Sequence, residues 1–262
     1  LERGHDQEFA ERVFQQIKGF GEYGFPESHA ASFGLLVYVS SWLKCHEPAA
    51  FYCGLLNSLP MGFYSPSQLI QDAMRHDITT LPLDAQHSGW DHRIEKIDTP
   101  SPVHKLPQGA LRLGLRQIKG LKEETGLRIE QAQPYRDIDD LSRRAALSDQ
   151  ELTFLARAGA LESLTGNRYR AHWESAGVDR PAELWQVAEA DADSCRYEVD
   201  LPAPSPGDDM LADYRYLGLT LGPHPMSLLR KDVDFAECRK AEDLASCRHD
   251  QFVQVAGLVT CR

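Results

Sequence analysis

The sequence lacks any apolar run long enough for a membrane-spanning helix. Such a helix takes about 20 apolar residues, and the best candidate, at 30–43, is clearly shorter. The first residues, LERGHDQEFAER, also lack the pattern of a secretory signal. We therefore expect no membrane segment and a cytoplasmic protein, with 30–43 buried in a core.

Cysteine patterns are absent too. The six cysteines form no CxxC pair and no Cys/His cluster with the spacing of zinc ligands. Cys45 and His46 are adjacent, but one such pair is not a metal site. The pattern predicts free, reduced thiols rather than a disulfide framework or a structural zinc site.

A surplus of positive charge, the usual signature of a nucleic-acid-binding protein, is missing as well, because the net charge is −11. The distribution matters more than the sum. Residues 101–172 carry 12 Lys/Arg against 9 Asp/Glu, a balance of +3. Residues 174–213 carry 2 against 11, a balance of −9. The acidity is concentrated in one segment, and the locally basic middle of the chain permits DNA binding.

Most of the chain has the apolar spacing of helices. The first four predicted helices lie at 6–18, 28–46, 49–58 and 66–76. Short alternating runs predict strands of one small sheet at 79–83, 92–97 and 110–115. Helical spacing returns from 118, and Ser148 with Glu151 forms a capping box at a further helix start. The predicted fold class is mainly α with a small β component (α+β).

Two later segments differ from this pattern. Residues 189–213 are acidic, rich in proline and low in aliphatic side chains, which predicts a linker. Residues 252–261 alternate in the manner of a strand.

A loop with two glycines and a proline precedes the helix predicted at 28–46. Glu27, Ser28 and His29 stand where that helix begins. Free backbone N–H groups, the helix dipole and polar side chains together can form an anion site. The alternative is a capped helix packed in a core, with Ser28 as the cap, and the local pattern alone favours this alternative.

The segment IKGLKEETG has the pattern of a helix–hairpin–helix turn. Ile118, Gly120 and Leu121 fit the motif hydrophobic-x-Gly-hydrophobic-Gly, whereas Lys122 replaces the second glycine. In such a turn, N–H groups at a helix start meet a DNA phosphate, and nearby lysines supply charge.

A second, degenerate unit of the same kind lies at 150–173, with Ala-Gly-Ala at its turn. Arg168 and Arg170 follow that turn and extend the basic surface in our interpretation. The alternative is that both are ordinary solvated charges. No base-reading pattern is visible, so duplex binding should be independent of sequence.

Five blocks of the sequence resemble, in order, the bacterial C-family DNA polymerases, which comprise the DNA polymerase III alpha subunit and its error-prone relative. The blocks are YGFPESHAASFGLLVYVSSWLKCHEPAAFYCGLLNS at 23–58, LRLGLRQIKGL at 111–121, LARAGALESL at 155–164, YLGLTLGPHPMSLLR at 216–230 and FVQVAGLVTCR at 252–262. Replicative members tend to carry Asn-Lys where this chain has Pro26 and Glu27. The FPESH form is similar to the error-prone, damage-tolerance branch.

The resemblance implies a segment that runs from the fingers to the start of an OB-fold. The implied parts are the end of the fingers at 1–60, a helix with a small linking sheet at 61–117, paired helix–hairpin–helix units at 118–175, an acidic linker at 176–213, and a connector with the first OB-fold strand at 214–262.

The resemblance also implies two sets of site residues. The residues expected at the nucleotide pocket are Tyr23, Glu27, Ser28 and His29. Those expected at the DNA backbone are Lys119, Gly120, Leu121, Lys122, Arg168 and Arg170.

In the family, the catalytic carboxylates that hold Mg²⁺ lie N-terminal to this segment. We therefore expect Mg²⁺ outside it, no catalytic or metal-binding residue within it, and no activity of the segment alone. The acidic pairs Asp139-Asp140 and Asp208-Asp209 lie in polar contexts and are expected on the surface.

The expected function is damage-tolerant (translesion) synthesis by a DNA-directed DNA polymerase, a nucleotidyltransferase, with primer–template DNA and an incoming dNTP as partners. The stretch at 185–213 has no sliding-clamp motif, so accessory translesion proteins are expected to supply clamp recruitment. Three alternatives are a replicative alpha-subunit segment, a helix–hairpin–helix module without a polymerase role, and a purely structural helical protein.

Overall fold

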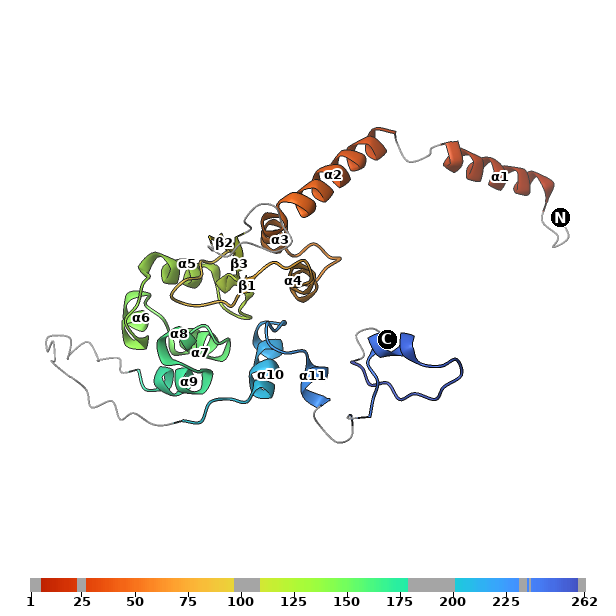
Figure 1. Cartoon of the computed structure of the whole chain (residues 1–262). Coiled ribbons are helices and arrows are strands. Elements are labelled where there is room, and N and C mark those ends of the chain that lie inside the picture. Colours follow the sequence, from red (N-terminus) through yellow and green to blue (C-terminus); the bar gives the residue numbers. More distant parts are fainter. Residues whose placement is uncertain are drawn as a thin grey trace, which may run out of the picture.

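The computed structural model describes residues 6–22, 27–96, 109–178, 201–230, 235 and 237–258, with backbone only at 17, 19–22 and 27–30. Two helices, α1 (Gln7–Glu22) and α2 (Glu27–His46), extend away from the other elements (Figure 1). The side chains from 31 to 42 are exposed. The predicted burial of 30–43 is therefore wrong for 31–42, because α2 packs mainly against α3 (Pro48–Asn57) at its C-terminal end.

A polar cluster joins α2, α3 and α4 (Pro66–Arg75). The Asp72 carboxylate accepts hydrogen bonds from Lys44 Nζ at 2.7 Å and from the Tyr52 hydroxyl at 2.6 Å. These two donors hold the pKa of Asp72 below its usual value. The start of α4 is closed by a capping box of Ser65 and Gln68.

The sheet has three short strands, β1 (Thr80–Leu81), β2 (Arg93–Glu95) and β3 (Ala110–Arg112), in the order β1-β3-β2. The central strand β3 pairs parallel with β1 and antiparallel with β2. Its Arg112 guanidinium donates two hydrogen bonds of 2.9 Å to Glu95. The mainly helical class with a small sheet is confirmed.

The remaining elements follow the sheet. They are η1 (Leu115–Gln117), α5 (Glu123–Ala132), α6 (Ile138–Arg144), α7 (Asp149–Arg157), α8 (Glu162–Thr165), α9 (Arg168–Ala176), α10 (Pro206–Tyr216), α11 (Pro225–Leu229) and η4 (Ala241–Ser246). A capping box of Ser148 and Glu151 starts α7, as the sequence predicts.

One hydrophobic core runs from Ala49 in α3 to Leu219 after α10. Its largest fully buried side chains are Tyr52, Leu56, Ile70, Leu111, Leu113, Leu115, Ile129, Ile138, Leu141, Leu152, Leu155 and Leu161. The domain boundaries predicted after 60 and after 117 fall inside this shared core, and the division into domains stays a prediction.

The C-terminal half differs from the sequence interpretation in two places. Residues 206–213, expected in the linker, form most of α10, because Ser205 and Asp208 build a capping box across the first turn, which begins at Pro206. Residues 252–258 form no extended strand and make one bridge, between Arg239 and Val255. An isolated alternating segment needs neighbouring strands to pair with.

The described helices include none that is both long and apolar enough to cross a membrane.

Candidate nucleic-acid interface

The first hairpin connects η1 to α5. Ile118 and Leu121 are buried, and the Leu121 N–H donates to the Ile118 carbonyl at 3.3 Å, which closes the turn. Lys122 stands at the N-cap of α5 in extended conformation. Among the described residues, no acceptor faces the N–H groups of Glu123 and Glu124, the first two residues of α5. These groups are free to meet an anion.

Gly120 fixes the shape of this turn. Its φ of +89° lies in the left-handed region that side chains disfavour. A Cβ at this position would lie 3.0 Å from Cζ of Phe154 in α7. The first hairpin therefore packs directly on the helix that leads to the second.

The two lysines of the turn have different surroundings. Lys119 donates from Nζ to the carbonyls of Tyr214 at 3.2 Å and Arg215 at 3.0 Å, and its N–H donates to the Tyr216 carbonyl at 3.0 Å. It thus satisfies the C-terminal carbonyls of α10. Lys122 is exposed and has no ion-pair partner within the described ranges.

The second hairpin connects α7 to α8 and α9 through Gly159, which also has a positive φ, of +77°. Arg168, the first residue of α9, lies beneath this turn and is 8% exposed. The prediction that Arg168 lies on the exposed basic surface is therefore wrong, and its contact with DNA stays a prediction.

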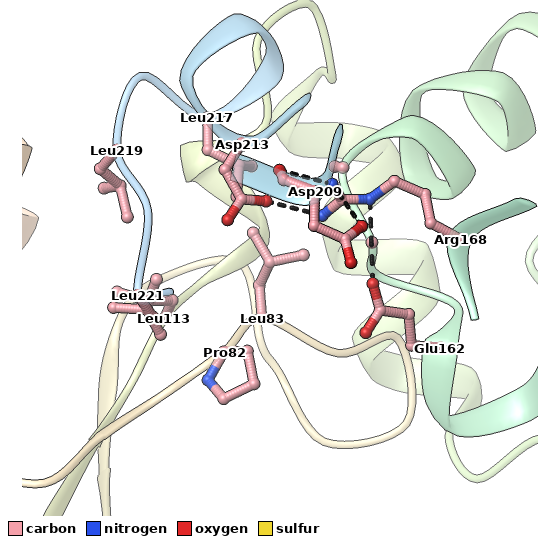
Figure 2. Close-up of a pocket in the computed structure, with 12 residues that line it drawn as sticks. Pro82, Leu83, Leu113, Glu162, Arg168, Asp209, Asp213, Leu217, Leu219 and Leu221 are labelled. Carbon is pink, nitrogen blue, oxygen red and sulfur yellow. Dashed lines mark hydrogen bonds and ion pairs between the residues drawn. The ribbon is translucent and has the colours of Figure 1, made fainter. Parts of the chain in front are cut away.

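Three carboxylates surround Arg168 (Figure 2). Asp213 Oδ1 lies 2.6 Å from Nη2, Asp209 Oδ1 lies 3.2 Å from Nη1, and Glu162 Oε1 lies 3.8 Å from Nε. The cluster lines a cavity of about 160 Å³ beside Gly159. Burial raises the pKa of both Glu162 and Asp209 above their usual values, despite the nearby guanidinium. One cation is thus shared by three acids.

Arg170 is half-exposed, and its Nε lies 2.7 Å from Glu174 one turn further along α9. Its N–H donates to Asn167, the N-cap of this helix. Arg170 therefore lies on the surface as expected, within an ion pair of the helix itself.

Of the residues predicted at the nucleotide pocket, those that the structure describes are not brought to the hairpins. Tyr23 lies outside the described residues, and Glu27, Ser28 and His29 begin α2 with backbone alone described. A helix of 20 residues is about 30 Å long. Because α2 meets α3 at its other end, its N-terminus is remote from both hairpins (Figure 1).

The described residues contain no group of three or more His, Cys, Asp or Glu side chains that is suited to hold a metal ion. Asp140 is buried, contrary to expectation. Burial alone would raise its pKa, but the Arg136 N–H and the Arg144 guanidinium hold the pKa below its usual value. Asp208 closes the capping box of α10, and Asp209 lies beside Arg168. These side chains do not fit a Mg²⁺ site.

Sequence reasoning missed the docking of α10 on both hairpins. Ser205, Pro206 and Asp208 carried a helix-start signal inside the acidic segment. The surrounding acidic composition favoured a linker over that local signal.

The geometry defines a helix–hairpin–helix region, and the comparisons agree. The family described as "Helix-hairpin-helix motif" matches residues 77–171, a range that contains both hairpins.

Relatives match the whole chain. Error-prone DNA polymerase of Pseudomonas aeruginosa (strain PAO1) is 51% identical over 265 residues, covering 100% of this chain and 25% of the relative. The error-prone DNA polymerase of Pseudomonas fluorescens (strain Pf-5) is 52% identical over 99% of this chain, and that of Teredinibacter turnerae is 51% identical over 100%, again with 25% of each relative covered.

The chain is therefore homologous to a segment of the error-prone DNA polymerases, and the resemblance drawn from its sequence blocks is confirmed. It spans about a quarter of the length of the curated relatives that it matches.

Proposed function

We propose that this chain is part of a DNA-directed DNA polymerase that acts in translesion synthesis, and that its first hairpin holds the primer–template duplex. The observation that carries the proposal is the unfilled start of α5 beside the exposed Lys122, within a range that matches the helix–hairpin–helix motif. Phosphates bind at such a helix start through backbone N–H groups, which carry no sequence information.

The acidic first turn of α5 limits the approach. The carboxylates of Glu123 and Glu124 interact favourably with the positive end of the helix dipole, but they repel a phosphate. The duplex therefore meets the turn from the side of Gly120 and Lys122, and binding is moderate in strength and sensitive to salt.

Replacing Lys122 with alanine is expected to weaken duplex binding about three- to tenfold near 0.1 M salt. The slope of log affinity against log salt should fall by about 0.9, because one phosphate contact is lost. Fluorescence anisotropy of a labelled primer–template across a salt series measures both, and duplexes of different sequence should show the same loss.

Lys240→Ala is the matched control, since Lys240 is also an exposed lysine and lies outside the hairpins in a pair with Glu242. An equal loss in both variants would show a general charge effect and contradict the proposed contact. Lys119→Ala should have the smaller effect of the two hairpin lysines, because its ammonium group already binds α10.

We propose further that Tyr23, Glu27, Ser28 and His29 face the incoming dNTP. What supports this is the family resemblance around FPESH. An anion at position 27 disfavours a triphosphate through like-charge repulsion, whereas a lysine attracts it.

In a full-length polymerase that contains this segment, Glu27→Lys is expected to lower the KM for the correct dNTP about threefold or more, on the scale of one charge contact near the surface. Misinsertion should fall relative to correct insertion. Steady-state single-nucleotide insertion measures both, with Glu27→Gln as the intermediate variant. Unchanged KM and fidelity in both variants would contradict the proposal.

The relatives named above are all error-prone polymerases, which favours that branch over the replicative alternative. Their identity also extends well beyond 77–171, which favours a polymerase segment over an independent binding module. The proposed setting is the cytoplasm, with Mg²⁺ bound elsewhere in the polymerase and accessory translesion proteins that supply clamp recruitment.

A further inference from the structure

Helix α10 binds two of the four cations that the sequence assigns to DNA, one from each hairpin unit. Near its start and middle, Asp209 and Asp213 bind Arg168 of the second hairpin unit. At its C-terminal end, main-chain carbonyls of 214–216 accept from Lys119 of the first. Figure 2 shows how Asp209 and Asp213 point from α10 toward the guanidinium.

The docking of α10 is mainly polar. None of its own residues is buried, and Leu211 is 64% exposed. Beyond the ion pairs, Gln117 donates to the Leu217 carbonyl at 2.7 Å, and Arg157 lies over the Tyr216 ring. The buried Leu217 and Leu219 anchor the chain in the core directly after α10. The helix itself is held by ionic and hydrogen-bonded contacts, which water or phosphate can replace.

In the cluster around Arg168, neither the hydrogen bonds nor the charges are fully balanced. Arg168 Nε and Asp209 Oδ1 are buried without a hydrogen-bond partner, although ion pairs reach both residues. Together with Glu162 and Asp213, the cluster has three carboxylates for one guanidinium, so it carries surplus negative charge beside the Gly159 turn. A phosphate is repelled from the second hairpin while α10 is docked.

We propose that α10 is a displaceable acidic strap that competes with duplex DNA for Arg168 and Lys119. While the strap is docked, the pair of hairpins contacts DNA through the first hairpin only. When α10 leaves, its carboxylates leave with it, and two cations become available to phosphates. The proposal rests on the proposed duplex contact of the first hairpin.

The test compares Asp213→Asn with Asp208→Asn in the full 262-residue chain. Both remove one charge from α10, but Asp208 binds Ser205 at its own cap and the Tyr169 side chain, and within the described residues it forms no ion pair with Arg168 or Lys119. A labelled primer–template should bind Asp213→Asn about three- to tenfold more tightly than Asp208→Asn, with a salt slope steeper by about 0.9 for each cation released. Hydrogen exchange of the amides of 206–216 reports undocking directly, and should quicken in Asp213→Asn and, in the unmodified chain, on addition of duplex.

Equal affinities of the two variants, or weaker binding by Asp213→Asn, would overturn the proposal of a displaceable strap. The proposed duplex contact of the first hairpin would be unaffected by either result. Slower exchange of 206–216 on addition of duplex would overturn it too, and this measurement needs no variant. If Asp213→Asn fails to fold, Asp209→Asn replaces it, since Asp209 is more exposed and holds the same guanidinium. Absence of duplex binding by the unmodified chain and by both variants would overturn both proposals, whereas binding by the strap variants alone would support the strap.

Discussion

Gly120→Ala is expected to lower the free energy of unfolding by about 2 kcal/mol and to weaken duplex binding about tenfold. A left-handed conformation costs a side chain about 1–2 kcal/mol, and the new Cβ would also press on Phe154 at 3.0 Å. Relief of either strain opens the turn and displaces the N–H groups at the start of α5. Urea unfolding followed by circular dichroism, with anisotropy for the duplex, measures the two effects.

Gly166→Ala separates the two causes. Gly166 has a φ of +90°, but nothing lies within 4 Å of its Cβ position. It should show the conformational cost alone, about 1 kcal/mol, with duplex affinity unchanged. Equal effects of both substitutions on DNA binding would mean that the hairpin shape is not what holds the duplex.

Gly114→Ala is expected to destabilise the protein by about 3 kcal/mol or more, in the range of the severest core substitutions. Gly114 has an ordinary negative φ, so the cause is space alone. A Cβ would lie 2.4 Å from backbone atoms of both Trp90 and Asp91, which no rotamer change can relieve. The urea midpoint should fall sharply, with loss of the near-ultraviolet signal of buried aromatic groups.

Gly54→Ala is the matched control for this second substitution. Gly54 lies inside α3 with nothing within 4 Å of its Cβ position. Alanine there should stabilise the helix by up to about 1 kcal/mol. The same substitution is thus predicted to act in opposite directions at two positions, and a loss at Gly54 as large as at Gly114 would contradict the packing argument.

Local signals predicted most of the fold correctly. The capping box at Ser148 marked the true start of α7, and the spacing from 66 to 76 marked α4 within one residue. Helix caps and hydrophobic periodicity depend on residues that are close together in the sequence, so a short stretch of sequence is enough to recognise them. All three strands were predicted from the sequence. Each predicted range is longer than the observed strand, because the alternating pattern continues beyond the residues that pair.

Features that depend on distant contacts were not predictable in this way. The apolar composition of 30–43 predicts burial, yet burial requires a partner surface that the described chain does not place against α2. Likewise Arg168 is 41 residues from Asp209 in sequence, and no local pattern pairs them. The hairpin of Ile118 to Leu121 was visible in sequence because its geometry depends on one glycine and two apolar neighbours. That Lys119 binds α10 while Lys122 stays exposed could not be predicted from the sequence, because it depends on where α10 docks.

The order of strands in the small sheet bears on how the chain folds as it is made. The central strand, β3, is the last of the three in sequence, and β1 and β2 do not pair with each other. Until residues 110–112 leave the ribosome, β1 and β2 therefore have no template and expose unpaired edges. The short central strand thus sets the moment at which this part of the polypeptide is committed to its native pairing, and a pause in translation before it prolongs the risk of misassembly.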